Sequence, residues 1–493
     1  MNTQAGKPSC QVKSGDSVPL PSLRSDLVFN MGSQMLLRIV TAVTALYAAR
    51  VLGPSRFGLW AMLQVLFMYT AQGHFGVVNA MMRDVPPALA RGEMDEARDV
   101  TNTSWTFVSV CSVPISLCAA GVVWCCIGPM STEKMLIVIG TAWLVAVQLQ
   151  SVFFQFYCRG YGKFRLLAGA SVLQAMLLLP LCFYLIPKYG IAGYLFALSG
   201  GFTVITVTVM IRPDLHWGLS KTRLVRLIAV GLPMLPSSLM LYLNMSVERI
   251  ALSTLGAAAV GVFVAGAFFF QTGGTIWELV IYTWYGRLAR LYGQTNSIDS
   301  VIKAFREIIP GALWVTSLLQ GAAYILLPIT LQRLLPGYVP SIAVSQVLVV
   351  AINLWGIAQL LSFCMAIVGR QKRAAMVQSA FLVLKLLAVL FAVMYVRQVQ
   401  VVALASAAAV GVYLILTYLE WKRISGHAID SITKWAVLWT IPNGIAVACS
   451  SLLGTERSLL ACVVYLLVVG GASLCLHTKS VAFRQLYAWG TTK

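Results

Sequence analysis

The chain has 493 residues, of which 59% are hydrophobic and 11% are charged, and its mean hydropathy is +0.82. An ordinary soluble domain carries about 25% charged residues, so this composition excludes a soluble domain and indicates a polytopic membrane protein. The net charge of +20 would suit nucleic-acid binding in a soluble protein. Here the basic residues are spread over short segments between apolar stretches, so we expect no nucleic-acid partner and an attraction to anionic membrane lipids instead.

Apolar segments of about 20 residues, the length that crosses a bilayer as a helix, follow one another from Asp26 to His477. The sequence therefore predicts an all-α polytopic membrane protein with about 14 transmembrane helices. The expected spans are 26-50, 57-82, 104-128, 134-158, 165-187, 190-211, 224-247, 258-286, 308-332, 339-368, 374-396, 399-419, 433-454 and 457-477. Residues 1-25 and 478-493 are expected to be cytoplasmic tails.

The distribution of Lys and Arg predicts the topology, because loops rich in these residues stay on the cytoplasmic side. Most of the 36 basic residues fall on the same side as the N-terminal tail when the predicted spans alternate across the membrane. We therefore expect both termini to be cytoplasmic.

The chain carries signs of an internal duplication. Residues 52–60 and 255–263 share Leu-Gly, a four-residue gap, Gly, an aliphatic residue and an aromatic residue, and basic turns recur at 162–165 and 369–372. Both corners are predicted on the outer face, so the halves are expected to be parallel repeats related by an axis along the membrane normal. The predicted organisation is a six-helix bundle at 26-211, a cytoplasmic linker at 212-223, a second six-helix bundle at 224-420 and two extra helices at 421-477.

Cysteine and histidine do not form a site. The eleven Cys lie almost entirely within predicted helices, where they are expected to act as small apolar residues. The four His are in separate segments without a partner at ligand spacing. We expect no metal, no cofactor and no catalytic residue.

Several motifs occur in an order that resembles a known family. They are Asn30-Met31-Gly32 followed by Arg38, 49–54 (Ala-Arg-Val-Leu-Gly-Pro), 57–60 (Phe-Gly-Leu-Trp), 159–164 (Arg-Gly-Tyr-Gly-Lys-Phe), 231–233 (Gly-Leu-Pro) and Glu248-Arg249. Over roughly residues 25 to 420 the chain resembles the polysaccharide repeat-unit (Wzx-type) flippases. These belong to the multidrug/oligosaccharidyl-lipid/polysaccharide exporter (MOP) superfamily, with the lipid II flippase, the multidrug extruders and a sporulation-linked branch.

The resemblance implies two six-helix bundles around a central cavity in the bacterial inner membrane. It implies translocation of an undecaprenyl-diphosphate-linked oligosaccharide for exopolysaccharide, capsule or O-antigen synthesis. A polysaccharide polymerase and chain-length machinery would then be the partner proteins. The lipid II flippase branch carries an arginine at the same distance from the first corner as Arg38 in this chain.

Polar side chains form stripes along four predicted helices, and in lipid a polar face must point at protein or water. Ser, Thr, Asn and Gln also join membrane helices to one another, so binding of sugar hydroxyls and helix packing both remain open for the uncharged members. The stripes supply these candidate substrate-binding residues: Asn30, Gln34 and Thr41 in the first helix, Gln148 and Gln155 in the fourth, Gln271 and Glu278 in the eighth, and Gln378 in the eleventh.

Arg38 and Lys385 lie within predicted helices, where a charge costs at least about 2.5 kcal/mol. Both are predicted to attract the diphosphate in a central cavity, and the alternative for each is a buried ion pair with Glu278. Glu248 and Arg249 are expected near the outer end of the seventh helix, as a structural ion pair or a topology anchor.

Pro233 and Pro236 are predicted to loosen the seventh helix as a gate. Two other functions compete with the flippase. A multidrug or cation antiporter of the same superfamily would favour intramembrane carboxylates, and a polysaccharide polymerase or ligase would carry a large outer loop that this sequence lacks.

Overall fold

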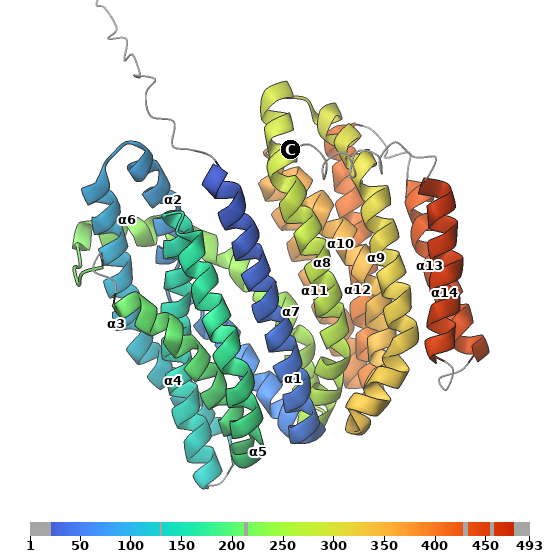
Figure 1. Ribbon diagram of the computed structural model, residues 1–493, viewed down its shortest axis with the longest axis horizontal. Coiled ribbons are helices and arrows are strands. Elements are labelled where there is room, and N and C mark those ends of the chain that lie inside the picture. Colours follow the sequence, from blue (N-terminus) through green and yellow to red (C-terminus); the bar gives the residue numbers. More distant parts are fainter. Residues whose placement is uncertain (1–20, 129–130, 212–214, 427–431, 454–457, 478–493) are drawn as a thin grey trace, which may run out of the picture.

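The computed structural model describes residues 21–128, 131–211, 215–426, 432–453 and 458–477, and every regular element in these ranges is a helix (Figure 1). The predicted tails fall wholly or largely outside the described residues. The elements are α1 (Pro21–Thr70), α2 (Val77–Ala90), α3 (Met94–Cys126), α4 (Thr132–Gly160), α5 (Phe164–Met210), α6 (Lys221–Gly231), η1 (Leu232–Met234), α7 (Leu235–Ser253), α8 (Ala257–Thr295), α9 (Ile298–Leu334), η2 (Pro336–Tyr338), α10 (Ser341–Ile367), α11 (Gln371–Phe391), η3 (Ala392–Val396), α12 (Val399–Ser425), α13 (Ile432–Leu453) and α14 (Ser458–His477).

Two helices, α1 and α5, are bent. α5 covers the fifth and sixth predicted spans, whereas α1 covers the first and only part of the second, which runs on through a turn at 71–76 into α2. At 1.5 Å per residue either would be at least about 70 Å long if straight, more than twice the thickness of a hydrocarbon core. The backbone turns back at Gly53 in α1 (φ 72°) and at Gly190 in α5 (φ 57°). Glycine adopts this positive φ without the strain that a Cβ would add, so the first predicted corner is a sharp bend rather than a loop.

The predicted seventh span is interrupted. α6 ends at Gly231, the 3₁₀ turn η1 follows, and α7 begins at Leu235. Pro233 lies in this turn and Pro236 follows within the first turn of α7. Proline removes a backbone donor and clashes with the preceding turn, which explains why one continuous helix does not form here.

The helices form two groups (Figure 1). The N-terminal group, α1 to α6, occupies one side of the molecule, and the C-terminal group, α7 to α12, occupies the other. α1 packs against α5 in its own group and against α8 in the other, so it joins the two. α13 and α14 pack against α9 at the outer edge of the C-terminal group.

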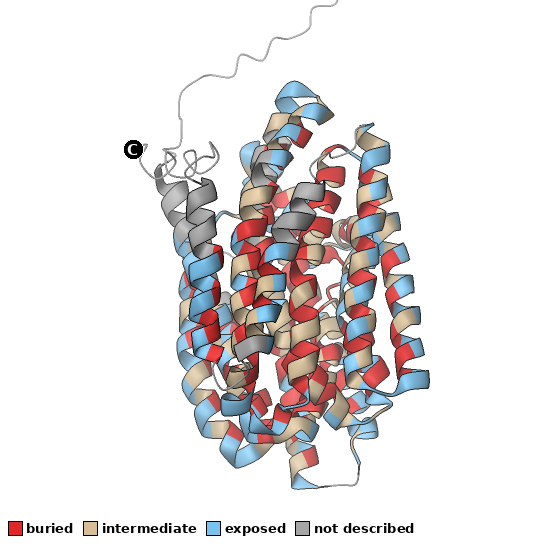
Figure 2. Ribbon diagram, turned by 90° about the vertical axis from the view of Figure 1, so that its right-hand side faces the viewer, coloured by how far each residue is buried: buried red, intermediate tan, exposed pale blue. Residues whose placement is uncertain are grey.

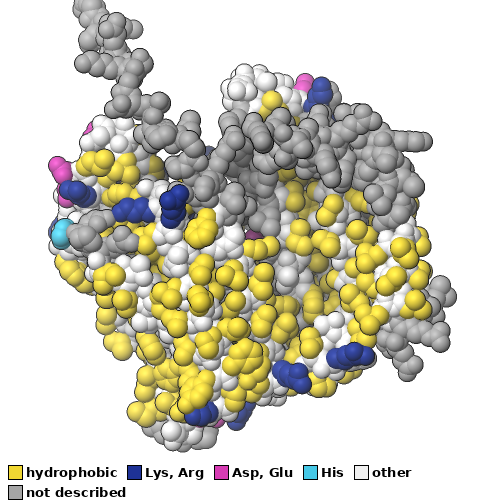
Figure 3. All heavy atoms as spheres, viewed as in Figure 1, with side chains coloured by type: hydrophobic (Ala, Val, Ile, Leu, Met, Phe, Trp, Pro, Cys, Tyr) yellow, Lys and Arg dark blue, Asp and Glu magenta, His cyan; other side chains and the backbone are white. Residues whose placement is uncertain are grey.

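Nine helices of the described chain are long and apolar enough to cross a membrane. Figure 3 shows hydrophobic side chains over the middle of the molecule and Lys and Arg toward its upper and lower margins. In Figure 2 buried residues lie between the helices, while exposed residues follow the outer helix faces. Large apolar side chains such as Leu117 (64% exposed) and Met176 (67% exposed) point outward, as lipid-facing residues do. The chain is therefore a multi-pass membrane protein, and the count of 14 spans stays a prediction.

The two duplicated corners pack directly against each other. A Cβ on Gly58 would overlap the backbone oxygen of Ala257, and a Cβ on Gly261 would overlap the backbone oxygen of Pro54. The contact is reciprocal, because each glycine and each oxygen holds the matching position in its copy of the corner. Both hairpins therefore close at one end of the molecule, where only glycine permits the backbones to approach this closely.

Candidate substrate site between the two helix groups

The second arm of α1 runs along α7 and forms a seam between the two groups. Hydrogen bonds cross this seam, and each bond of this kind between membrane helices stabilises their packing modestly. The seam contains three of them: Arg249 Nη1 to Gln64 Oε1 at 3.2 Å, Tyr69 Oη with Ser246 Oγ at 2.9 Å, and Gln72 Nε2 to Tyr242 Oη at 3.1 Å.

The seam ends at a second reciprocal glycine contact. Gly76, at the start of α2, and Gly231, at the end of α6, each leave no room for a Cβ against the other's backbone carbonyl group. The corner contact thus joins the two groups, whereas the contact of Gly76 with Gly231 lies within the N-terminal group, between α2 and α6, just before the chain enters α7. Space for a ligand is left between these contacts.

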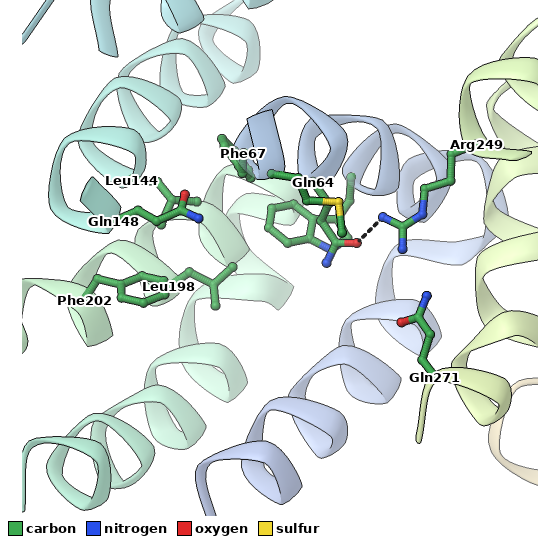
Figure 4. A pocket seen from close by; sticks show the side chains of 10 residues that line it. Gln64, Phe67, Leu144, Gln148, Leu198, Phe202, Arg249 and Gln271 are labelled. Carbon is green, nitrogen blue, oxygen red and sulfur yellow. Dashed lines mark hydrogen bonds between the residues drawn. The ribbon is translucent and has the colours of Figure 1, made fainter. Parts of the chain in front are cut away.

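A cavity of about 270 Å³ opens beside the seam (Figure 4). Residues of both groups line it, so its shape depends on how the groups sit relative to each other. Figure 4 shows Arg249 and Gln271 approaching from one side and Gln148 from the opposite side. The lining residues are Trp60, Gln64, Phe67, Met68, Leu144, Gln148, Leu198, Phe202, Arg249 and Gln271.

Arg249 is the charged residue of this lining, and only 4% of it is exposed. A guanidinium carries five N–H donors, and within the described part of the chain one of them is used, toward Gln64. Its sequence neighbour Glu248 pairs with Lys385 instead. The cavity wall therefore holds a buried positive charge that has donors to spare.

The rest of the lining combines aromatic rings with amides. Trp60 is 2% exposed, and its indole N–H has no hydrogen-bond partner among the described residues. The amides of Gln148 and Gln271 also make no hydrogen bond to the described chain. Gln148 is half-buried and Gln271 is exposed, so their amides are available to a ligand with oxygen atoms. For the buried indole N–H of Trp60, the lack of a partner costs about 1–3 kcal/mol.

Arg38 lies between the two groups but outside this lining. Its Nη1 atom is 3.4 Å from Glu278 Oε2 and 3.3 Å from Thr275 Oγ1, both on α8. The side chains of Arg38 and Glu278 are 56% and 41% exposed, so the pair is open rather than buried. One turn earlier on α1, Gln34 donates to Ser171 of α5 at 2.7 Å.

Lys385 is placed away from the cavity, inside the C-terminal group. Its ammonium pairs with Glu248 at 2.7 Å, and both side chains are 9% exposed. The alternative of a buried ion pair is thus realised for Lys385, but with Glu248 and not with Glu278. Glu248 thus takes part in a structural ion pair, one of the two roles expected for Glu248 and Arg249, but its partner is Lys385, and the described residues show no ion pair between Glu248 and Arg249.

The remaining polar candidates are scattered. Thr41 is exposed and bonds the backbone oxygen of Leu37 in its own helix. Gln155 is half-buried on α4 and Gln378 is exposed on α11, and neither lines the cavity. The side chain of Asn30 lies outside the described residues.

Sequence reasoning did not select Gln64 or assign a ligand role to Arg249. Its position near the outer end of the seventh helix instead favours a structural ion pair or a topology anchor. Helical spacing could have identified Arg249. Glu248 lies four residues after Asn244, so these two side chains share one face of the helix, and this face is opposite the seam that carries Arg249. Gln64 carries no local signal, because its partner is 185 positions away.

No protein-family model matches the chain, and no curated protein is similar to it in sequence. Solved structures do share its fold. The lipid II flippase MurJ in an inward closed conformation matches with a TM-score of 0.70 at 11% identity, over 92% of this chain and 100% of that chain.

Two further matches come from the same superfamily. An inward-facing multidrug resistance MATE family transporter gives a TM-score of 0.68 at 16% identity, over 83% of this chain and 99% of its own. A MOP superfamily transporter from Pyrococcus furiosus, described as having a binding pocket of reverse polarity, gives 0.55 at 17% identity, over 83% and 95%.

The chain therefore has the fold of the MOP superfamily transporters, as MATE transporters and the lipid II flippase have it. The predicted superfamily fold is confirmed. The narrower resemblance to polysaccharide repeat-unit flippases stays a prediction.

Proposed function

We propose that this protein moves an isoprenoid-diphosphate-linked oligosaccharide from the cytoplasmic to the outer leaflet of the bacterial inner membrane. The observation that carries the proposal is Arg249, a buried and under-used cation in a cavity whose described lining residues include no carboxylate. A buried charge needs a counter-charge, and an anionic substrate supplies it. A diphosphate is such an anion and pairs well with a guanidinium.

The cavity would hold only part of such a substrate. Its volume of about 270 Å³ is at the lower end of pockets for small molecules, roughly 300–1,000 Å³. We assign it to the diphosphate and the first sugar. The amides of Gln64, Gln148 and Gln271 would bond hydroxyl groups, and the ring of Trp60 would face the sugar. The isoprenoid tail stays in lipid.

Alternating access would require the two groups to separate at one end and meet at the other. The reciprocal corner contact closes one end, which the charge distribution assigns to the outer face. The break at Pro233 and Pro236 lies beside Gly231 at the other end of the seam, so we propose this break as the hinge that lets α7 move relative to α6.

Arg38 is proposed to guide the anion between the groups. Arg38→Ala is expected to lower transport about tenfold, equivalent to roughly 1.4 kcal/mol, because it leaves the carboxylate of Glu278 uncompensated on the anion's route. Arg38→Lys should keep most activity, since it keeps the charge. Surface polysaccharide in cells that carry each variant in place of the native copy, at matched protein levels, measures the effect.

The proposed function is tested by deleting the gene. We expect loss of a surface polysaccharide and accumulation of its lipid-linked repeat unit on the cytoplasmic side, both restored by the native gene. Unchanged polysaccharide together with increased sensitivity to cationic dyes would overturn the flippase and favour the antiporter.

The antiporter is favoured by one observation, the half-exposed carboxylate of Glu278. Glu278→Gln separates the two functions. A cation antiporter would lose transport with this carboxylate, whereas a flippase for an anion would keep it because Arg38 remains charged.

A further inference from the structure

Lys385 is enclosed by oxygen atoms from a single turn of α7. Its Nζ atom lies 2.7 Å from Glu248 Oε1, 2.6 Å from the backbone oxygen of Asn244 and 3.0 Å from Asn244 Oδ1. An ammonium has three N–H donors, and here each has an oxygen within hydrogen-bonding distance. Lys385 is therefore a buried cation with a complete set of oxygen partners, and it is absent from the cavity lining.

These oxygens are of the types that bind hard metal cations. A carboxylate, a backbone carbonyl and a side-chain amide oxygen together are typical ligands of such ions. A third helix fixes the carboxylate, because Ser406 of α12 donates to Glu248 Oε1 at 2.9 Å. The ammonium of lysine is itself a compact point charge, so it fills the place that a small cation would take among these atoms.

We infer that Lys385 is a built-in cation that occupies an oxygen site for a monovalent metal ion such as Na⁺. Because the ammonium is attached to α11, it cannot exchange with ions in solution. The site then stays neutral at any Na⁺ concentration and holds α7, α11 and α12 together. Removal of the ammonium with its oxygens retained should turn this place into an exchangeable Na⁺ site. The inference does not depend on the transported substrate.

The test measures the Tm of the purified full-length protein in choline chloride and in NaCl at equal ionic strength. Lys385→Ala should have a lower Tm than the native protein in choline chloride, since Glu248 is then left buried and unpaired. Exchange of choline for Na⁺ should raise the Tm of this variant by at least about 2 °C, the effect of a ligand that binds only the folded state. The native protein should show no such rise.

Two further variants make the result specific. Lys385→Ser keeps the site empty and adds a hydroxyl oxygen, so it should respond to Na⁺ like Lys385→Ala. The double variant Lys385→Ala with Glu248→Gln lacks the carboxylate and should not respond. The inference is overturned if both single variants are indifferent to Na⁺, if neither folds in NaCl, or if the native protein gains the same stabilisation from Na⁺.

Discussion

Arg249→Ala is expected to lower transport at least about 30-fold while the protein still inserts and folds. Truncating one partner of a buried charged contact costs roughly 2–5 kcal/mol of binding, and 2 kcal/mol corresponds to a factor of about 30. Folding should be less affected, because the substitution also removes the cost of burying an unpaired charge. Surface polysaccharide and the amount of protein in the membrane are measured together.

Two further substitutions serve as controls for Arg249→Ala. Arg249→Lys keeps the charge but loses the planar fork that binds two oxygens at once, so it should retain partial activity. Arg333, at the end of α9, is exposed and does not line the cavity, and Arg333→Ala should leave transport unchanged. Native transport by Arg249→Ala at native abundance would remove Arg249 from the substrate site.

Gly58→Val is expected to force the two corners apart. The added side chain meets the backbone of Ala257, which cannot change rotamer to make room. Overpacking of this kind costs about 1–3 kcal/mol, and the cost falls only on the state in which the corners touch. Spin labels at Ser55 and Ala258, exposed residues beside the contact, should report a longer distance in the variant, with the accessible native cysteines replaced.

Gly121→Val is the matched control, because Gly121 lies within α3 and has no atom within 4 Å of a Cβ position. It should leave the distance between the labels unchanged. Gly261→Val should reproduce the effect of Gly58→Val, since the contact is reciprocal. Equal distances in Gly58→Val and the native protein would show that the corners do not close this end.

The glycine positions of the two corners could be predicted from the sequence, but the contact between the corners could not. The positions of Gly53 and Gly58 follow from a local pattern, and the structure places a bend at Gly53 and a close contact at Gly58. The contact of Gly58 with the other copy of its own motif could not be predicted. A contact between residues about 200 positions apart leaves no trace in the spacing of either copy.

For the charged residues too, the sequence predicted positions but not partners. The sequence located Arg38, Lys385 and Glu278 correctly within helices, where each needs a partner. Glu248 was expected near the outer end of the seventh helix, and α7 extends past it to Ser253. The sequence could not assign the partners, because one helix carries several faces and the neighbour of each face depends on packing. Lys385 pairs with Glu248 and Arg38 contacts Glu278, so Arg249 remains as the buried cation beside the cavity.

The sequence by itself determined that this is an all-helical membrane protein, that it contains two copies of a glycine corner, and which polar residues lie within its helices. These properties depend on composition and on intervals of three or four residues, which a chain carries locally. Only the tertiary structure decided which cation faces a ligand and which is neutralised. That choice depends on the rotation of α7 against α1 and α11, and helix rotation is set by packing between distant segments.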